Sequence, residues 1–307
     1  MNIPRAHHFL PQFYLDRWAR DGKLYRYIRP LGADGKLHGA WKPPRAVAYE
    51  RDLYHLPDIE DPAESQALEM RFFQQIDDRA AKALARFDRG EHGTTEERVA
   101  LSQFMVSLLH RSPSRLQAIR GELAKQSRGA PFEGLEGEAF DHALKSTSNR
   151  LLNALVESAD ASSVVSQFQT FGIDVTDARR TLLASDRPIT VSAMLIAPDA
   201  FMILPYAPHR LLVLARDPRV AQAFASQDAT VLVEGINQAV VEQSMDVVIA
   251  ADANATAMVD RLFMRPQPGR VLDSIGLIRR KSPLIDLRPK AREFSRHRKN
   301  AMRYLGS

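Results

Sequence analysis

Apolar residues between positions 68 and 87 recur every three or four positions, which is the spacing of one face of an α-helix. Asp61, Pro62 and Glu64 precede this stripe as a helix N-cap, a proline at the first helical position and a carboxylate three residues beyond the cap. The stripe ends at Gly90. We predict a long amphipathic helix over this stretch.

Further helical stripes follow in the first half of the chain. One begins at Thr94 or Thr95 and should break at Pro113, because proline lacks an amide hydrogen and disfavours helix at the residue before it. A second segment covers residues 116–123, and a loop with glycines at residues 129–137 leads to a helix over residues 140–155. The first half is therefore predicted to be mainly helical.

The remaining pattern predicts strands. Residues 23–28 alternate with period two and precede the turn signal at residues 34–35, which indicates a small N-terminal β element. Short apolar runs fit buried strands of a sheet later in the chain, at residues 181–184, 201–204 and 211–214. A long helix in the C-terminal half should follow Asp228, with Val233 to Val248 contributing to its inner side. The predicted fold class is α+β.

Composition supports a folded protein of this class. The 307 residues are 45% hydrophobic and 26% charged, as in ordinary globular proteins. We expect a single composite domain over residues 1–278 and a basic C-terminal extension over residues 279–307. No apolar run is long enough for a membrane helix, and no leader precedes a cleavage site, so we expect a cytoplasmic protein without a membrane partner. The absence of cysteine excludes thiol catalysis.

Positive charge is concentrated at the C-terminal end. Residues 279–307 hold ten basic and two acidic residues, a net +8, which leaves −3 for the rest of a chain whose total is +5. Such a cluster favours nucleic acid or another polyanion as partner, with Arg279, Arg280 and Lys281 among the binding residues. The alternative is a solvated terminus that only aids solubility.

Two motifs carry a family resemblance. The first is the aromatic block at residues 7–18, of which residues 8–15 carry the resemblance, and the second is Ser185-Asp186-Arg187-Pro188 after an apolar run, followed by a proline-centred strand start at residues 204–208. With these motifs the chain resembles the bacterial domain-of-unknown-function 4238 family over most of residues 7–250. Trp18 stands where that family usually has Phe, and Arg187 occupies a variable slot. The resemblance implies an intracellular bacterial protein and no established activity.

The first motif supplies two candidate residues. Its aromatic side chains should dock onto a core and so carry His8 and Arg17 to a defined place. His8 is a candidate catalytic acid, base or metal ligand, because imidazole titrates near neutral pH. It could equally hydrogen-bond a backbone carbonyl and lock the segment. We assign Arg17 a binding role.

Charged residues on the predicted helices supply two more candidates. Glu69 and Asp77 border one apolar face, but their backbones are about 12 Å apart along a helix, too far to share one ion easily. At most one belongs to a site, and the alternative for both is a salt bridge to Arg111 or Arg115. Arg111 ends a polar stripe and could clamp a phosphate or carboxylate. The competing interpretation is a buried Arg–Glu pair between two helices.

Asp186 completes the candidate set. It follows a predicted buried strand, where a loop could present it as a base or metal ligand, with Ser185 as a binding residue. It could also accept backbone amides and fix a turn. Glycine-rich phosphate loops, metalloprotease helices and nucleophile elbows are absent from the sequence, and neither a metal nor a cofactor is identified.

Two functions from different classes remain open. The first is a hydrolase of phosphodiester or other anionic substrates, with His8, Glu69 and Asp186 as acid–base or metal-binding groups and Arg111 as the anion clamp. The second is a non-enzymatic protein that binds nucleic acid or an anionic partner through the basic tail. Protein-interaction and regulatory functions form a third, unspecified class.

Overall fold

The computed structural model describes residues 5–30, 35–91, 94–126, 132–157, 167–192, 195–263 and 302–304. These residues form a mixed α+β fold with antiparallel sheets. Most of the predicted basic extension lies outside the described residues, including Arg279, Arg280 and Lys281. Within the described ranges, no helix combines the length and the apolar character needed to cross a membrane.

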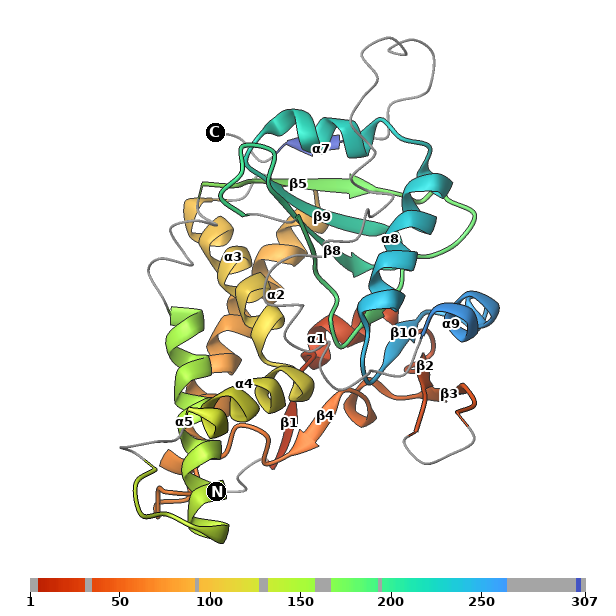
Figure 1. Ribbon diagram of the computed structural model, residues 1–307. Helices are drawn as coiled ribbons and strands as arrows, with labels where there is room; N and C mark the ends of the chain where they lie inside the picture. The colour runs from red at the N-terminus through yellow and green to blue at the C-terminus, as the bar shows by residue number, and fades with distance from the viewer. Residues whose placement is uncertain are drawn as a thin grey trace.

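Four long helices form one side of the molecule, at the left of Figure 1. They are α2 (Gln74–Asp88), α3 (Thr95–His110), α4 (Pro113–Lys125) and α5 (Gly137–Glu157). The short helix α1 (Gln12–Leu15) lies in the first motif. Three helices belong to the later part of the described chain, α7 (Pro218–Ala225), α8 (Ala229–Gln243) and α9 (Thr256–Leu262). Single helical turns also occur at Asp16–Trp18, Pro44–Ala46 and Glu64–Gln66.

The strands of the described residues form three sheets. A two-stranded sheet pairs β1 (Ala6–His8) with β4 (Tyr49–Arg51). The second has the order β3-β2-β10-β6, with β2 (Leu24–Ile28), β3 (His38–Lys42), β6 (Ala184–Ser185) and β10 (Val248–Ala250). The third has the order β11-β5-β9-β8-β7, with β5 (Gln169–Asp174), β7 (Thr190–Val191), β8 (Phe201–Ala207), β9 (Arg210–Ala215) and β11 (Met302–Tyr304).

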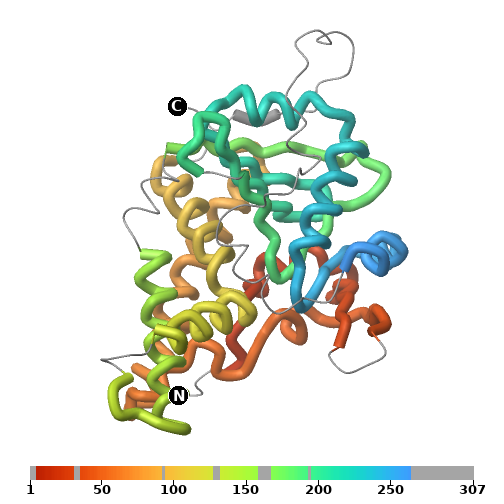
Figure 2. Tube along the Cα trace, viewed as in Figure 1, coloured from red at the N-terminus to blue at the C-terminus, as the bar shows by residue number. Residues whose placement is uncertain are grey.

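The third sheet lies between two apolar layers. Along β8, Met202 and Leu204 face a core shared with α2 and α3, whereas Ile203 faces a second core shared with α7 and α8. This alternation follows from the period of two in a strand. Figures 1 and 2 show the long helices on one side of the sheet and α7 and α8 on the other.

The helix start at Thr94 and the break before Pro113 are confirmed, but the N-cap predicted at Asp61 is not, because the first helical turn there, Glu64–Gln66, has Ala63 as its N-cap. The Asp61 carboxylate accepts the backbone N–H groups of Ala63 and Glu64, at 2.9 and 2.8 Å. The break before Pro113 separates α3 from α4. The stretch before α2 is not regular α-helix, however, because Leu68–Phe73 forms a π-helix that periodicity alone cannot distinguish.

The strand predictions are correct for β2, β3, β8 and β9, and wrong in two places. We predicted that Val248 belongs to a long helix, but α8 ends at Gln243 and Val248 begins β10. Val248 is buried between β2 and β6. Its position is therefore apolar for the same reason as one on the buried face of a helix. The predicted strand at residues 181–184 is displaced, since β6 contains only Ala184 and Ser185.

The aromatic block of the first motif docks as predicted. The side chains of Tyr14 and Trp18 are fully buried. Tyr14 donates its hydroxyl hydrogen to the backbone carbonyl of Pro205 at 2.7 Å, and the Trp18 indole N–H donates to the carbonyl of Leu182 at 3.2 Å. The first motif is therefore bonded to β8 and to the segment that leads into the second motif.

Candidate active site

Three of the four predicted catalytic residues lie together where β1 meets α2 and α3. Arg111 donates from Nη1 to the carboxylate of Asp77 at 3.0 Å and from Nε to the carbonyl of Phe9 at 2.9 Å. The Glu69 carboxylate accepts the backbone N–H of His8 and interacts electrostatically with Arg111. The structure thus brings His8, Glu69 and Arg111 into one buried cluster.

Arg111 holds this cluster together and has no exposed surface. Its guanidinium carbon lies 5.6 Å from the ring centroid of Phe73 and 5.9 Å from that of Phe104, in cation–π geometry. The side chain is 0% exposed. This is the buried ion pair between helices that the sequence left open, with Asp77 as the direct partner. A ligand cannot reach the guanidinium without a rearrangement of the core.

Burial changes the protonation of both carboxyls in the cluster. It raises the pKa of Glu69 to about 7 and that of Asp77 to about 6, while the charge of Arg111 acts in the opposite direction. Burial also lowers the pKa of His8, and the Arg111 charge adds to this effect. The atoms Glu69 Oε2, His8 Nε2 and Arg111 Nη2 are buried without a hydrogen-bond partner among the described residues.

Asp186 lies elsewhere and organises a loop. It is fully buried, and its carboxylate accepts the backbone N–H groups of Met245, Asp246 and Val247 at 3.0 to 3.2 Å. Its own N–H donates to the carbonyl of Val247 at 3.1 Å. This is the amide-accepting role that the sequence left open for Asp186. The carboxylate fixes the loop between α8 and β10 rather than its own turn.

The two predicted binding residues of the motifs also make structural contacts. The Ser185 hydroxyl donates to the carbonyl of Val240 at 3.3 Å and accepts the N–H of Arg187 at 3.2 Å. Arg17 forms an ion pair with Asp88 at 2.9 Å and lies over the ring of Tyr206. Neither contact tests a binding role.

A cavity of about 260 Å³ lies beside the first motif. It is bounded by the segment after β1, by β2, by β4, by the start of α4 and by the loop that Asp186 holds. The lining residues are Phe9, Arg26, Ile28, Ala48, Tyr49, Glu50, Pro113, Asp246 and Val247. Both motifs thus contribute to its walls, the first through Phe9 and the second through the loop at residues 245–247.

Asp246 is the titratable group in this cavity with the strongest shift. Burial raises the pKa of its carboxyl to about 7, and the nearby carboxylates of Asp186 and Glu50 raise it further, whereas the charge of Arg187 lowers it. A carboxyl with such a pKa exchanges its proton near neutral pH. It is therefore suited to general acid–base chemistry.

One arginine lines the same cavity, and other cations interact with its carboxylates. Arg26 lines it, Arg187 lies close enough to influence Asp246, and Arg120 and Lys145 interact with Glu50. Buried guanidinium nitrogens of three arginines have no hydrogen-bond partner among the described residues: Arg26 Nε, Arg115 Nε and Arg120 Nη2. Burial and the nearby charge of Arg187 lower the pKa of Arg115 to about 10.

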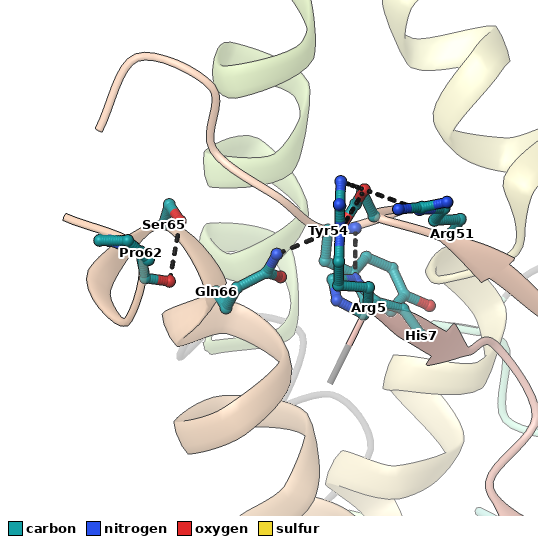
Figure 3. Close-up of polar contacts among 8 residues, drawn as sticks. Arg5, His7, Arg51, Tyr54, Pro62, Ser65 and Gln66 are labelled. Atoms are coloured by element: carbon teal, nitrogen blue, oxygen red, sulfur yellow. Dashed lines mark hydrogen bonds and ion pairs between the residues drawn. The ribbon is translucent and has the colours of Figure 1, made fainter. Parts of the chain in front are cut away.

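The wall formed by β4 is held in place by polar contacts (Figure 3). Asp52 accepts hydrogen bonds from Arg5 Nε at 3.0 Å and from Gln66 Nε2 at 3.3 Å. The backbone N–H of Tyr54 donates to Nδ1 of His7 at 3.0 Å, and the two rings stack. These contacts fix the strand that presents Tyr49 and Glu50 to the cavity.

Backbone strain marks both ends of the same strand. Ala48 and Asp52, the residues on either side of β4, have φ angles of 54° and 55°. Residues with side chains rarely adopt this left-handed conformation, and where they do it is often at functional sites. The Ala48 carbonyl accepts the N–H of Phe9 at 3.0 Å, which ties the strained residue to the first motif.

Sequence reasoning missed Asp246, Glu50 and Arg26. Asp246 was hidden because the apolar residues after it were assigned to the preceding helix. The signal that could have revealed it is the order of a helix, a short polar segment and a β-branched run at residues 247–249. Glu50 and Arg26 have no local signal, because only the pairing of distant strands places them at one cavity.

Among the described residues, no group of three or more His, Asp or Glu side chains is arranged to hold a metal ion. Comparison with curated proteins and with solved structures gave no match. One family model does match, over residues 6–254, and is described as protein of unknown function (DUF4238). This range includes both motifs, the cavity and every one of its lining residues. The chain therefore belongs to the DUF4238 family.

Proposed function

We propose that the protein is a hydrolase that cleaves a phosphodiester or a similar anionic ester in the cavity lined by Asp246 and Glu50. The observation that carries the proposal is the lining of this cavity, which brings Asp246, Glu50 and Arg26 together from three separate segments. The raised pKa of Asp246 adds to it. The proposal keeps the substrate class expected from the sequence. It moves the acid–base role from His8, Glu69 and Asp186 to Asp246 and Glu50 in this cavity.

The two carboxyl groups divide the proton transfers. Protonated Asp246 donates its proton to the oxygen of the leaving alcohol as the bond between that oxygen and phosphorus breaks. Glu50 accepts a proton from the water whose oxygen forms the new bond to phosphorus. Two carboxyls at one site commonly take such opposite roles when their environments differ. Asp186 acts as a positioning residue, because it holds the loop that carries Asp246.

The arginines supply the affinity for an anion. A phosphodiester carries one negative charge before attack and gains a second as water adds. Guanidinium groups with free N–H donors bind such oxygens in bidentate fashion. Arg26 lines the cavity, and buried N–H groups of Arg115 and Arg120 lack partners in the described part of the chain. An anionic substrate in the cavity would give Arg26 an acceptor, and the charges of Arg115 and Arg120 add to the positive potential nearby.

The test is hydrolysis of bis(4-nitrophenyl) phosphate by the full chain across a range of pH. We expect the Asp246→Asn variant to lose about 100-fold or more in kcat, the usual contribution of general acid–base catalysis. The wild-type profile should show an ionisation near pH 7 that belongs to Asp246 and is missing from the variant. Glu50→Gln should lose activity to a similar degree.

Asp199→Asn is the matched control, since Asp199 is exposed and remote in sequence from every wall of the cavity. It should keep the wild-type rate and pH profile. Absence of phosphodiester hydrolysis by the wild-type protein would overturn the proposal. So would an Asp246→Asn variant that is folded and fully active.

The second function expected from the sequence is binding of nucleic acid or an anionic partner through the basic tail. Of residues 279–307 the structure describes only β11, so this hypothesis gains no structural support. A cytoplasmic, bacterial protein remains our expectation from the sequence and its family resemblance.

A further inference from the structure

A second cavity, of about 130 Å³, lies at the opposite end of β10 from the first. Asp246 and Val247 precede β10 and line the first cavity, whereas Asp252 and Asn254 follow β10 and line the second. The second cavity shares no lining residue with the first. It is therefore a separate feature of the fold and needs its own explanation.

Positive charge dominates the second cavity. Arg20, Arg179 and Arg180 line it, and among the described residues none of the three forms an ion pair with a carboxylate. Asp252 is the one acidic residue among the lining residues that the structure describes, and its Oδ1 accepts the N–H of Asn254 at 2.9 Å. Three cations and one anion give a net charge of +2 when His209 is neutral. Such a concentration of unpaired charge attracts an anion.

His209 adds an unsatisfied polar atom to the same lining. Its Nδ1 is buried and has no hydrogen-bond partner among the described residues. The backbone of His209 is fixed, because its carbonyl accepts the N–H of Val175 at 3.0 Å. A buried polar atom without a partner costs free energy, and an anion in the cavity would give this nitrogen an acceptor when it carries its proton.

The walls are fixed by backbone hydrogen bonds before any ligand arrives. Arg20 and Lys23 exchange two hydrogen bonds, at 2.8 and 3.0 Å, across a two-residue turn. The turn needs positive φ at both central residues, and Asp21 and Gly22 have values of 47° and 73°. The N–H of Arg179 donates to the Thr230 hydroxyl at 3.3 Å. Ordered walls lower the entropic cost of binding.

Asn237 fixes the segment that leads from the cavity to the second motif. Its side-chain oxygen accepts the N–H of Leu183 at 2.8 Å, and its amide nitrogen donates to the carbonyl of Thr181 at 2.9 Å. Both halves of the amide are thus used inside the protein. Asn237 therefore shapes the wall and leaves ligand recognition to the arginines and His209.

We propose that this second cavity binds a single phosphate group, either as inorganic phosphate or as the phosphate of a monoester. Its volume is below the roughly 300–1,000 Å³ typical of pockets for larger organic ligands, so only a small group fits inside. Phosphate offers enough oxygens for several guanidinium groups and matches the net charge of +2. This site is independent of the hydrolase proposal.

The test is calorimetric titration of the full chain with inorganic phosphate at constant ionic strength set by chloride. We expect saturable binding by the wild-type protein and a Kd raised by about tenfold or more in the double variant Arg179→Gln/Arg180→Gln, which corresponds to about 1.4 kcal/mol. Glycerol 2-phosphate is titrated in parallel. Tighter binding of the ester identifies a phosphomonoester as the ligand, and tighter binding of phosphate identifies the free ion.

Arg71→Gln/Arg79→Gln is the matched control, because it removes two exposed arginines remote from the cavity and changes the net charge equally. It should leave the Kd within about twofold. The single variant His209→Gln provides a second test that keeps all three arginines, and it should weaken binding as well. Absence of saturable binding by the wild type, or equal weakening in the control, would overturn the proposal.

Discussion

At the scale of single residues, the buried cluster around Arg111 shows that a sequence can identify which polar residues lie near a core. It does not show which groups those residues contact. The sequence identified His8, Glu69, Asp77 and Arg111 as polar residues close to apolar faces. It left open what they bind, because their contacts span 34 positions for Arg111 with Asp77 and 102 for Arg111 with the Phe9 carbonyl. Local spacing cannot decide between a buried ion pair and a ligand clamp when the partner is so distant.

Glu69 allows a prediction for stability. Its pKa is raised from 4.5 to about 7 in the folded protein, so the folded state holds this proton more tightly than the unfolded state does. The resulting stabilisation is complete below pH 4.5 and is lost as the pH rises through about 7. Glu69→Gln should therefore be more stable than wild type above pH 7, by on the order of 3 kcal/mol, and match it below pH 4.5. Urea unfolding at several pH values measures the difference.

The same substitution at Glu234, on the exposed side of α8, serves as a control. Its difference in stability from the wild type should be the same at acidic and alkaline pH. A Glu69→Gln protein that is less stable than wild type at every pH would contradict the prediction. That outcome would mean that ionised Glu69 gains more from the charge of Arg111 than it loses by burial.

At the scale of elements, signals confined to a few neighbouring residues were sufficient for the helix ends. The capping box at Thr94 and the break before Pro113 depend on groups within three positions. β10 could not be predicted in this way. Its three residues are all buried, so they lack the alternation that identifies a half-exposed strand. Its neighbours β2 and β6 are far away in the sequence.

Gly172 gives a prediction for the contact between β5 and α2. A Cβ atom on Gly172 would lie 2.5 Å from Cε1 of Phe87, whose side chain is buried in the core. Overpacking of this kind costs about 1–3 kcal/mol. We expect Gly172→Ala to lower the free energy of unfolding by this amount, measured by urea denaturation.

Gly121, in α4, is a matched control at which alanine should change the free energy of unfolding in the opposite direction. A Cβ atom there meets nothing within 4 Å, and alanine in a helix is more favourable than glycine by about 0.5–1 kcal/mol. Gly121→Ala should therefore stabilise the protein. Equal effects of the two substitutions would show that the contact with Phe87 is not what constrains Gly172.

At the scale of the whole molecule, the fold joins segments that are far apart in the chain. One apolar core contains Tyr14 and Trp18 of the first motif, helix residues such as Leu84 and Phe104, and strand residues such as Leu204. The sequence predicted that the aromatic block docks, from its composition alone. It could not predict the acceptors, the Pro205 and Leu182 carbonyls, because backbone groups carry no residue-specific signal.

This shared core predicts cooperative unfolding. The chain has two tryptophans, and Trp41 is 45% exposed whereas Trp18 is fully buried. In a Trp41→Phe variant, fluorescence reports Trp18 alone, while far-ultraviolet circular dichroism is dominated by the helices. We expect the two urea transitions to coincide, as for a two-state protein. Separate midpoints would show that the first motif and the helices unfold independently.

The pairing of β2 with β10 also has a consequence for biosynthesis. Tyr27, in β2, shares a hydrogen bond with Thr256, in the helix α9 that follows β10, and the two residues are 229 positions apart. At translation rates of about 5–20 residues per second, the ribosome needs roughly 10–50 s to make the intervening chain. During this time β2 lacks its neighbour in the sheet and is open to chaperones or to aggregation. The first motif also waits for its partners, because the carbonyls that accept from Trp18 and Tyr14 follow them by 164 and 191 positions.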